Sequence, residues 1–389
     1  MRLRPVVVMV ATVAILGACT RSDPAAGPAA PPDQPVARVK IAFLQDLSAA
    51  DAALRTAPAF QGAKLAFDTV GLSGDLDVEV ELVALDTQGD PETATLVARK
   101  VAADPDFVGA IGAPFLTAQR AVGAVLDAAG VPTITLSTLG PDFAKAGWTS
   151  WRRAVAGQAR QGAAVAAFVD SLPGATRRGV CLLGDGSQTA SGLLRPVAGA
   201  LRAGIVLRSR VALGDGRTDG VADAVRDAGC GVVIWGGLSG QGALVRGRLV
   251  DGGLQRVAFV GADGMKDGTF LFVSGTAGRG TVAACPCADL STATELAAQR
   301  FIQDYQADFG LPPGPYAVEA WDVARMFVQA FRAGALTRAE VLGSLWSVDR
   351  FDGLANTYVF EPTGELAPGA ARVHLYREQA GRWVAFQEG

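Results

Sequence analysis

Histidine is almost absent from this chain of 389 residues, which contains only His374. A Ser-His-Asp or Cys-His catalytic site would have to use this one side chain, which lies in a predicted strand. The sequence also lacks a Gly-x-Ser-x-Gly motif and a Walker A motif. Gly278-Arg279-Gly280 precedes a predicted strand, whereas a dinucleotide-binding loop follows one. These absences argue against an enzyme and predict no cofactor.

The chain also lacks a large excess of positively or negatively charged residues. The chain has 35 Lys and Arg residues against 38 Asp and Glu residues, a formal net charge of −3. Its basic residues are scattered rather than clustered, so we expect no nucleic-acid partner. Half of the residues are apolar, yet beyond the first 18 residues no apolar run is long enough to cross a bilayer. This composition is typical of a soluble globular body.

The first residues have the pattern of an export signal. A basic start at Arg2 and Arg4 is followed by an apolar run from Pro5 to Leu16, and the run ends in Leu-Gly-Ala before Cys19. This ending resembles the lipobox of bacterial lipoproteins, which implies cleavage after residue 18 and a lipid on Cys19. The alternative is an ordinary cleaved signal with an incidental cysteine. Either interpretation predicts an extracytoplasmic protein, and the first tethers it to the membrane.

The next segment has the composition of a spacer. Residues 19–37 consist mainly of Pro, Ala, Gly and small polar residues, which cannot bury enough apolar area to fold. The globular body is expected to begin at Arg38. About 350 residues remain, which is more than a single core usually holds, so we expect two domains.

Four cysteines remain after Cys19, and an even number in an exported protein indicates disulfides. Cys181 and Cys230 lie near the starts of strands that are expected to be neighbours, and they are the preferred pair. Cys285 and Cys287 would then pair with each other or stay reduced. A closed zinc site usually needs four nitrogen or sulfur ligands, so no metal site is predicted.

Strand and helix patterns alternate from residue 39 onward and then restart. Apolar, β-rich runs alternate with helical runs, which predicts βαβ units and mostly parallel sheets. In the first half we expect strands at 39–44, 78–85, 107–112 and 131–136, with helices at 59–70, 91–103 and 117–129. Asp90 is placed to cap the second of these helices, with Pro91 at its first position. Residues 139–153 have the Gly and Pro content of a connection between the two halves.

The second half repeats this rhythm and is followed by a different region. We expect strands at 179–183, 205–213, 231–235 and 257–260, with helices at 190–203, 219–227 and 240–251. Long amphipathic helices follow at 294–309 and 317–333. Another helix starts at Thr337, where Glu340 completes a capping box. Terminal strands are expected at 357–360, 372–376 and 381–386.

A ligand site is expected where parallel strands end, because that is where open α/β sheets form a crevice. Hydroxyls and helix-start amides follow strands of the first half, from Thr117, Ser137 and Thr138. Such groups favour a carboxylate. Asp263 follows a strand of the second half in a glycine-flanked turn, and it would suit an ammonium group. Taken singly, Thr117 is more simply a helix cap and Asp263 a turn residue. Together they predict a zwitterionic ligand.

Several short motifs resemble one known family in their order and spacing. They are the helix start Phe60-Gln61-Gly62-Ala63-Lys64, the segment from Asp86 to Ala94, Ile111-Gly112-Ala113, Trp235-Gly236-Gly237, Gly261-Ala262-Asp263-Gly264, the segment from Tyr316 to Asp322, and the turn from Phe360 to Glu365. The body, from Val39 to about Phe386, resembles the type I periplasmic binding proteins. It is most similar to the Leu/Ile/Val-binding subgroup, which delivers ligands to ABC importers.

This resemblance implies an α/β fold of two doubly wound Rossmann-like lobes joined by three crossovers. The first lobe would comprise residues 38–152 plus 288–347, and the second residues 153–287 plus 348–389. The ligand would lie between the lobes, which close on it by a hinge motion. The resemblance implies that Thr117, Ala118, Ser137 and Thr138 hold its carboxylate. Asp263 would take the ammonium group, and Thr189 and Leu238 would line the second-lobe side.

The sequence departs from this family at several positions. Residues 54, 189 and 238 are Leu, Thr and Leu, where family members often have an aromatic residue. This changes the expected pocket shape and weakens the case for leucine or valine as the ligand. The loop from Pro114 to Thr117 lacks the usual serine-rich run. The first-lobe disulfide common in the subgroup has no counterpart here.

Three functions follow from these observations. The leading hypothesis is a monomeric, membrane-tethered binding protein that captures an amino acid or similar small polar molecule for an ABC permease. The second is a ligand-sensing module that acts with a separate signalling partner, because the chain contains no output domain of its own. The third, an extracellular hydrolase, is disfavoured by the missing catalytic motifs.

Overall fold

The computed structural model describes residues 36–112, 116–137, 139–140, 143–173, 179–210, 218 and 220–386, without the side chains of residues 116, 117 and 210. The chain divides into two compact units, residues 1–36 and 37–389. The predicted leader, Cys19 and most of the predicted spacer lie outside the described residues. The fold described below is therefore that of the second unit, which begins one residue before the expected start at Arg38.

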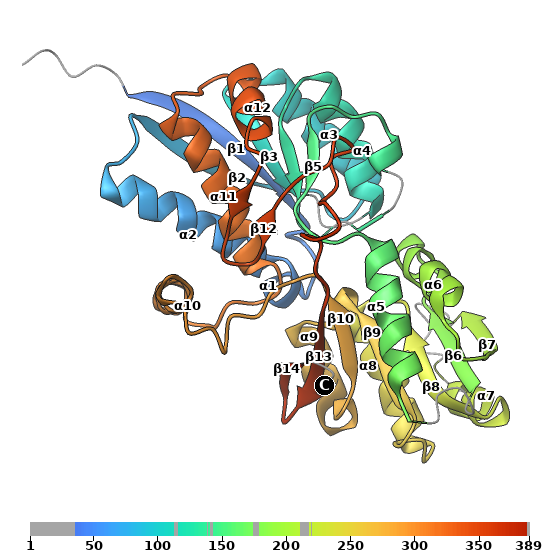
Figure 1. The fold of residues 1–389 in the computed structure, drawn as a ribbon. Helices are drawn as coiled ribbons and strands as arrows, with labels where there is room; N and C mark the ends of the chain where they lie inside the picture. Colours follow the sequence, from blue (N-terminus) through green and yellow to red (C-terminus); the bar gives the residue numbers. More distant parts are fainter. Residues whose placement is uncertain are drawn as a thin grey trace, which may run out of the picture. The chain divides into compact units, whose positions relative to one another are not determined.

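The first lobe is built on a parallel sheet of five strands in the order β2-β1-β3-β4-β5 (Figure 1). The strands are β1 (Ala37–Gln45), β2 (Val78–Asp86), β3 (Phe107–Gly112), β4 (Thr133–Thr135) and β5 (Trp151–Arg153). Four of them were predicted. The fifth lies in the segment 139–153, which the sequence suggested was only a connection. Its three residues are too short for a recognisable strand pattern, and pairing with β4 defines β5 as the edge of the sheet.

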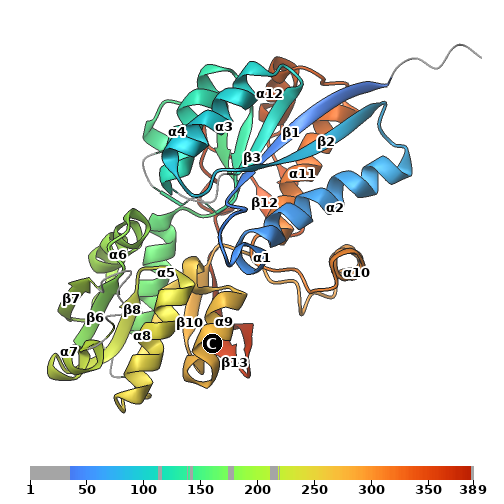
Figure 2. The same ribbon diagram turned by 180° about the vertical axis from the view of Figure 1, so that it is seen from behind.

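Both faces of this sheet are covered by helices, as the alternation along β1 requires. Ile41 and Phe43 point into one core, and Ala42 and Leu44 point into the other. The first face is covered by α2 (Ala57–Ser73), α11 (Ala317–Arg332) and α12 (Arg338–Trp346). The second is covered by α3 (Pro91–Ala103) and α4 (Leu116–Ala128), which Figure 2 shows from the other side.

Two helices of this lobe begin as their sequences predict. The Asp90 carboxylate accepts a hydrogen bond from the backbone N–H of Thr93 at 2.7 Å, with Pro91 at the first position of α3. Thr337 and Glu340 form the predicted capping box at the start of α12. These caps satisfy backbone donors that the first helical turn leaves without partners. A short helix, α1 (Ala52–Arg55), precedes α2.

The second lobe is built on a sheet of seven strands in the order β14-β13-β10-β9-β8-β6-β7. The strands are β6 (Gly179–Gly184), β7 (Ile205–Arg210), β8 (Cys230–Trp235), β9 (Ala258–Ala262), β10 (Val282–Cys285), β13 (His374–Gln379) and β14 (Arg382–Phe386). The first five run parallel to one another. The terminal hairpin of β13 and β14 joins them antiparallel through β10. The last two of the expected terminal strands thus lie in the second sheet.

Helices cover both faces of this sheet too. Val180 and Leu182 of β6 face α5 (Gln158–Ser171) and α6 (Gln188–Ala200). Cys181 and Leu183 face the opposite core, with α7 (Val221–Asp227), α8 (Ser239–Asp251) and α9 (Gly268–Ser274). Helices α5 and α9 are additions to the predicted elements, whereas strand β10 follows Gly278-Arg279-Gly280, where a strand was expected. The result is the expected doubly wound α/β architecture.

The chain passes between the two lobes three times. It leaves the first sheet after β5 and enters α5, and it returns after β10 to α10 (Leu296–Phe309) and α11. Helix α10 packs beside α2, and α11 packs beside α2 and β3. The third passage leads from about residue 371 to β13. These passages are the three crossovers that the resemblance implied.

One segment lies in a different lobe from the one expected. Strands β11 (Phe351–Asp352) and β12 (Thr357–Tyr358) were assigned with residues 348–389 to the second lobe. Instead, Tyr358, Leu366 and Ala370 are buried in the first-lobe core with α11 and α12. The Tyr358 hydroxyl donates to the buried Asp322 of α11 at 3.0 Å. Apolar burial and this hydrogen bond hold the segment on the first lobe until the final crossover.

The cysteine pairing agrees with the preferred prediction. Cys181 of β6 is bonded to Cys230 of β8, the neighbouring strand, with their Cα atoms 5.8 Å apart. Cys285 is bonded to Cys287, with Cα atoms 5.1 Å apart, at the second crossover. The sequence left open whether Cys285 and Cys287 pair with each other or stay reduced, and in the structure they are paired.

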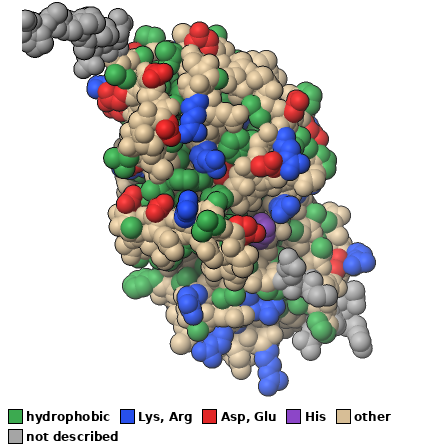
Figure 3. Space-filling model, turned by 60° about the vertical axis from the view of Figure 1, so that its left-hand side comes forward, with side chains coloured by type: hydrophobic (Ala, Val, Ile, Leu, Met, Phe, Trp, Pro, Cys, Tyr) green, Lys and Arg blue, Asp and Glu red, His purple; other side chains and the backbone are tan. Residues whose placement is uncertain are grey.

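Charged side chains of both signs lie on the surface of the described residues. On the face shown in Figure 3, positively and negatively charged side chains alternate in the upper part, and Lys and Arg predominate in the lower part. In the part of the chain that the structure describes, no helix has the length and apolar character needed to cross a membrane.

Candidate ligand-binding site

A cavity of about 100 Å³ lies where strands of both sheets end. The first lobe contributes Gln45 at the end of β1, Gly112 at the end of β3 and Ser137 after β4. The second lobe contributes residues that follow β6, β8 and β9, including Thr189, Leu238 and Asp263. This is the crevice position expected for an open α/β sheet, duplicated on two facing lobes. Its volume suits a single small molecule.

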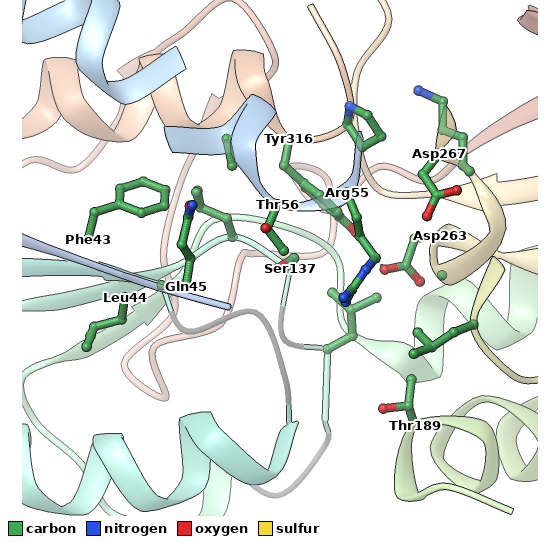
Figure 4. A pocket seen from close by; sticks show the side chains of 18 of the residues that line it. Phe43, Leu44, Gln45, Arg55, Thr56, Ser137, Thr189, Asp263, Asp267 and Tyr316 are labelled. Atoms are coloured by element: carbon green, nitrogen blue, oxygen red, sulfur yellow. The ribbon is translucent and has the colours of Figure 1, made fainter. Parts of the chain in front are cut away.

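Four of the seven predicted ligand residues line this cavity: Ser137, Thr189, Leu238 and Asp263. Figure 4 shows Ser137, Thr189 and Asp263 around the same space. The other three are Thr117, Ala118 and Thr138. Thr138 and the Thr117 side chain lie outside the described part of the chain. The Ala118 side chain is buried in the first-lobe core with β1 and α3, and Ala118 does not line the described cavity. Any role of Ala118 would rest on its backbone amide.

Asp263 lies between the two lobes. It follows β9 directly, and its Oδ1 accepts a hydrogen bond from Gln161 Nε2 of α5 at 2.6 Å. Its Oδ2 accepts one from the hydroxyl of Tyr316 at 2.7 Å. Tyr316 immediately precedes α11 of the first lobe, so this carboxylate connects the lobes across the cavity (Figure 4).

Burial controls the protonation of this carboxylate. Loss of solvent raises the pKa of Asp263, and the hydrogen bonds from Gln161 and Tyr316 oppose that rise. Burial, together with the Asp263 charge, holds the pKa of Tyr316 well above its ordinary value, so the phenol remains a donor. A cationic ligand group beside Asp263 would favour its ionised form. The site therefore suits an ammonium group better than a second anion.

Tyr316 was not predicted as a ligand residue, although it begins a motif noted in the sequence. Its backbone is in the left-handed region, with φ of 62°, where a residue other than glycine is strained. Tyr316 is only 7% exposed to solvent. Gly62 of α2 lies against the next residue, since a Cβ at Gly62 would fall 2.0 Å from the carbonyl oxygen of Ala317. Close packing of α2 on the start of α11 thus helps to position the phenol.

The cavity also contains charged side chains that the sequence did not single out. Arg55 of α1 forms ion pairs with Asp51 at 3.0 Å and Asp46 at 3.5 Å. Asp267 caps α9 by accepting from the backbone N–H of Phe270 at 2.9 Å. Burial raises the pKa of Asp267 to about 6, and the nearby charge of Arg55 opposes this. Lys266, next to Asp267, also lines the cavity.

Apolar side chains complete the lining. Phe43, Leu44 and Leu136 contribute from the first lobe, and Leu238 contributes from the second. Figure 4 shows Phe43 and Leu44 at the end of β1. In the described ranges, no group of three or more His, Cys, Asp or Glu side chains is arranged to hold a metal ion. The arrangement provides polar recognition of a small organic molecule within a partly apolar pocket.

Comparisons with known proteins agree with this architecture. The chain is 24% identical to "Leu/Ile/Val-binding protein homolog 3" of Brucella melitensis biotype 1, over 79% of this chain and 83% of that protein. It is also 24% identical to "Leu/Ile/Val-binding protein BraC3" of Rhizobium johnstonii, over 83% of this chain and 87% of that protein.

Solved structures share the fold. The branched-chain amino acid transporter substrate-binding protein LivJ of Streptococcus pneumoniae, in complex with isoleucine, superposes with a TM-score of 0.80 at 19% identity. The match covers 90% of this chain and 99% of that structure. A family model described as periplasmic binding protein matches residues 38–374, most of the folded unit. With two doubly wound lobes, three crossovers and a cavity between the sheets, this chain belongs to the periplasmic binding protein family.

Proposed function

We propose that this protein captures an α-amino acid, or a closely similar zwitterion, for delivery to an ABC permease. The observation that carries the proposal is Asp263, a carboxylate that lines the cavity and connects both lobes. The names of the relatives support an amino-acid ligand, since they are Leu/Ile/Val-binding proteins. The function is binding, and no catalytic step is part of it.

The ligand would lie with its two charged ends toward different lobes. Its ammonium group would approach Asp263, whose two carboxylate oxygens already accept hydrogen bonds. The positive charge of the ligand would then compensate the negative charge of this buried carboxylate. Its carboxylate would lie toward the first lobe, near Ser137 and the start of α4. We retain Thr117, Ala118 and Thr138 as part of this carboxylate site, because helix-start amides and hydroxyls bind anions.

The proposal can be tested by replacing Asp263 with an isosteric neutral group. Asp263→Asn keeps the shape and an acceptor but removes the charge. We expect at least about a tenfold loss of amino-acid affinity in isothermal titration calorimetry, since charge-assisted hydrogen bonds are worth about 1.5–3 kcal/mol. Asp251→Asn is the matched control, because Asp251 is exposed at the end of α8 in the same lobe. Equal affinity for Asp263→Asn and the unchanged protein would disprove the proposed role.

The proposal also includes an extracytoplasmic location, a lipid on Cys19 and a monomeric binding unit. An extracytoplasmic location is a property of the periplasmic binding protein family. The lipid rests on the leader sequence. Membrane fractionation of Cys19→Ala tests the tether, with loss from the membrane fraction as the expected result. Retention of this variant in the membrane fraction would contradict the lipid anchor.

A further inference from the structure

Lys266 is a buried cation that lines the cavity. It lies three positions after Asp263, in the turn that follows β9, and the residue is 9% exposed. Its ammonium nitrogen stands 4.0 Å from the centre of the Tyr376 ring. Within the described part of the chain, this nitrogen makes neither a hydrogen bond nor an ion pair. Among the described residues, the Tyr376 ring face is thus the one recorded partner of an ammonium that carries three hydrogen-bond donors.

The surrounding carboxylates compensate this charge only from a distance. Glu319 and Asp289 attract the Lys266 ammonium, while burial lowers its pKa. Glu319 uses one oxygen to accept from the backbone N–H of Ala288 at 2.6 Å. Its other oxygen is buried and has no hydrogen-bond partner. Neither carboxylate is paired directly with Lys266, so the ammonium keeps its hydrogen-bonding capacity.

An ammonium group in a largely buried side chain lowers the stability of the protein when it has no hydrogen-bond acceptor. The position of Lys266 therefore indicates which groups a ligand should carry. Burying a charged donor costs free energy unless hydrogen bonds replace its water. Lys266 and Asp263 belong to the same short turn of the second lobe and border the same cavity.

We propose that the natural ligand is an amino acid whose side chain ends in an oxygen acceptor, a carboxylate or an amide carbonyl, bound by Lys266. This inference rests on the proposed function. A purely aliphatic side chain would leave the ammonium without an acceptor in a closed pocket, and a site built around such a donor rejects ligands that lack the matching group.

The first test is a ligand series on the purified protein. Glutamate, glutamine, aspartate and asparagine are compared with norvaline and leucine by isothermal titration calorimetry. We expect at least one acceptor-bearing amino acid to bind about tenfold tighter than norvaline, which lacks the terminal acceptor. The contrast between glutamate and glutamine then identifies the acceptor as a carboxylate or an amide. Equal or tighter binding of the aliphatic amino acids would overturn the inference.

The second test removes the donor. Lys266→Met keeps the length of the side chain, and we expect it to abolish the preference while affinity for norvaline is unchanged or higher. Lys64→Met is the control, since Lys64 is half-exposed on α2 and paired with Asp68. Lys266→Gln is the second variant if Lys266→Met does not fold. An equal loss of affinity for every amino acid would show that Lys266 has only a structural role.

The two proposals fail in different ways. If aliphatic amino acids bind with a dependence on Asp263 but without any effect of Lys266, only the side-chain inference is wrong. If no α-amino acid binds to the unchanged protein, the proposed function itself is wrong and the inference falls with it.

Discussion

Asp263 and Asp267 are four positions apart and line the same cavity, yet their surroundings give them different tasks. Asp263 accepts from two side chains that belong to different lobes. Asp267 accepts from a backbone amide at the start of α9. Both are buried, and burial raises the pKa of each. At the scale of single residues, the cavity therefore combines a carboxylate that links the lobes, for which we propose ligand recognition, with one that caps a helix.

The raised pKa of Asp267 predicts a pH dependence of stability. Its pKa is about 6 in the folded protein against an ordinary 3.8, so the folded state binds a proton more readily than the unfolded chain. The contribution of this group therefore favours folding as pH falls from about 7 to 4, by roughly 3 kcal/mol. Asp267→Asn keeps the helix cap but cannot titrate, so the free energy of unfolding should depend less on pH.

Urea denaturation at several pH values between 4 and 7.5 measures this difference. Glu319 and Asp322 also have raised pKa values, about 7 and about 6, so part of the pH dependence should remain. Asp251→Asn serves again as the exposed control. Parallel pH profiles for Asp267→Asn and the unchanged protein would show that the carboxyl does not titrate in this range.

At the scale of elements, the start of α11 is held against α2. Tyr316 occupies a left-handed conformation immediately before α11. Most residues of α11, from Ala317 to Phe331, are buried. Gly62 allows the backbones to approach so closely that no side chain fits between them. The phenol that reaches Asp263 is therefore positioned by helix packing rather than by its own loop.

Gly62→Ala tests this coupling between packing and the site. The added methyl group would overlap the carbonyl of Ala317, and overpacking of this kind costs about 1–3 kcal/mol. We expect a lower melting temperature together with weaker ligand binding, because α11 must shift and carry Tyr316 with it. Gly71→Ala is the control, since the equivalent space near Gly71 is empty. Normal ligand affinity in a destabilised Gly62→Ala protein would separate the helix contact from the site.

At the scale of the whole molecule, each lobe has its own cores on both faces of its own sheet. The crossovers make the cavity a shared product of the two lobes, because residues from both are required to enclose it. The Cys181–Cys230 bond, in contrast, lies within the second lobe and joins adjacent strands. Its effect should therefore fall mainly on the stability of that lobe.

Replacing Cys181 and Cys230 together with alanine tests this division. The bond closes a segment of 49 residues, for which the chain-entropy model gives about 4 kcal/mol. We expect a second-lobe transition at lower temperature in calorimetry, whereas the first-lobe transition should change little. A uniform shift of a single transition would show that the lobes unfold as one unit. Amide hydrogen exchange of β6 and β8 provides an independent measurement.

Much of the fold follows from local patterns. The strands were recognisable from short runs such as Val39 to Leu44, whose β-branched and apolar residues are buried on both faces of the sheet. The caps at Asp90 and Thr337 were recognisable because a cap depends on residues only three positions apart. Asp263 was predicted because the end of a parallel strand is a local feature with a known place in the crevice.

Other features depend on contacts between distant segments. Tyr316 reaches Asp263 from 53 positions away, and Tyr358 joins the first-lobe core although the chain later returns to the second lobe. The unpaired ammonium of Lys266 became visible only when its neighbours were known. The sequence determined most of the elements and the family, because these reside in short-range patterns. The tertiary structure decided which groups meet at the cavity, because burial and pairing are set by residues far apart along the chain.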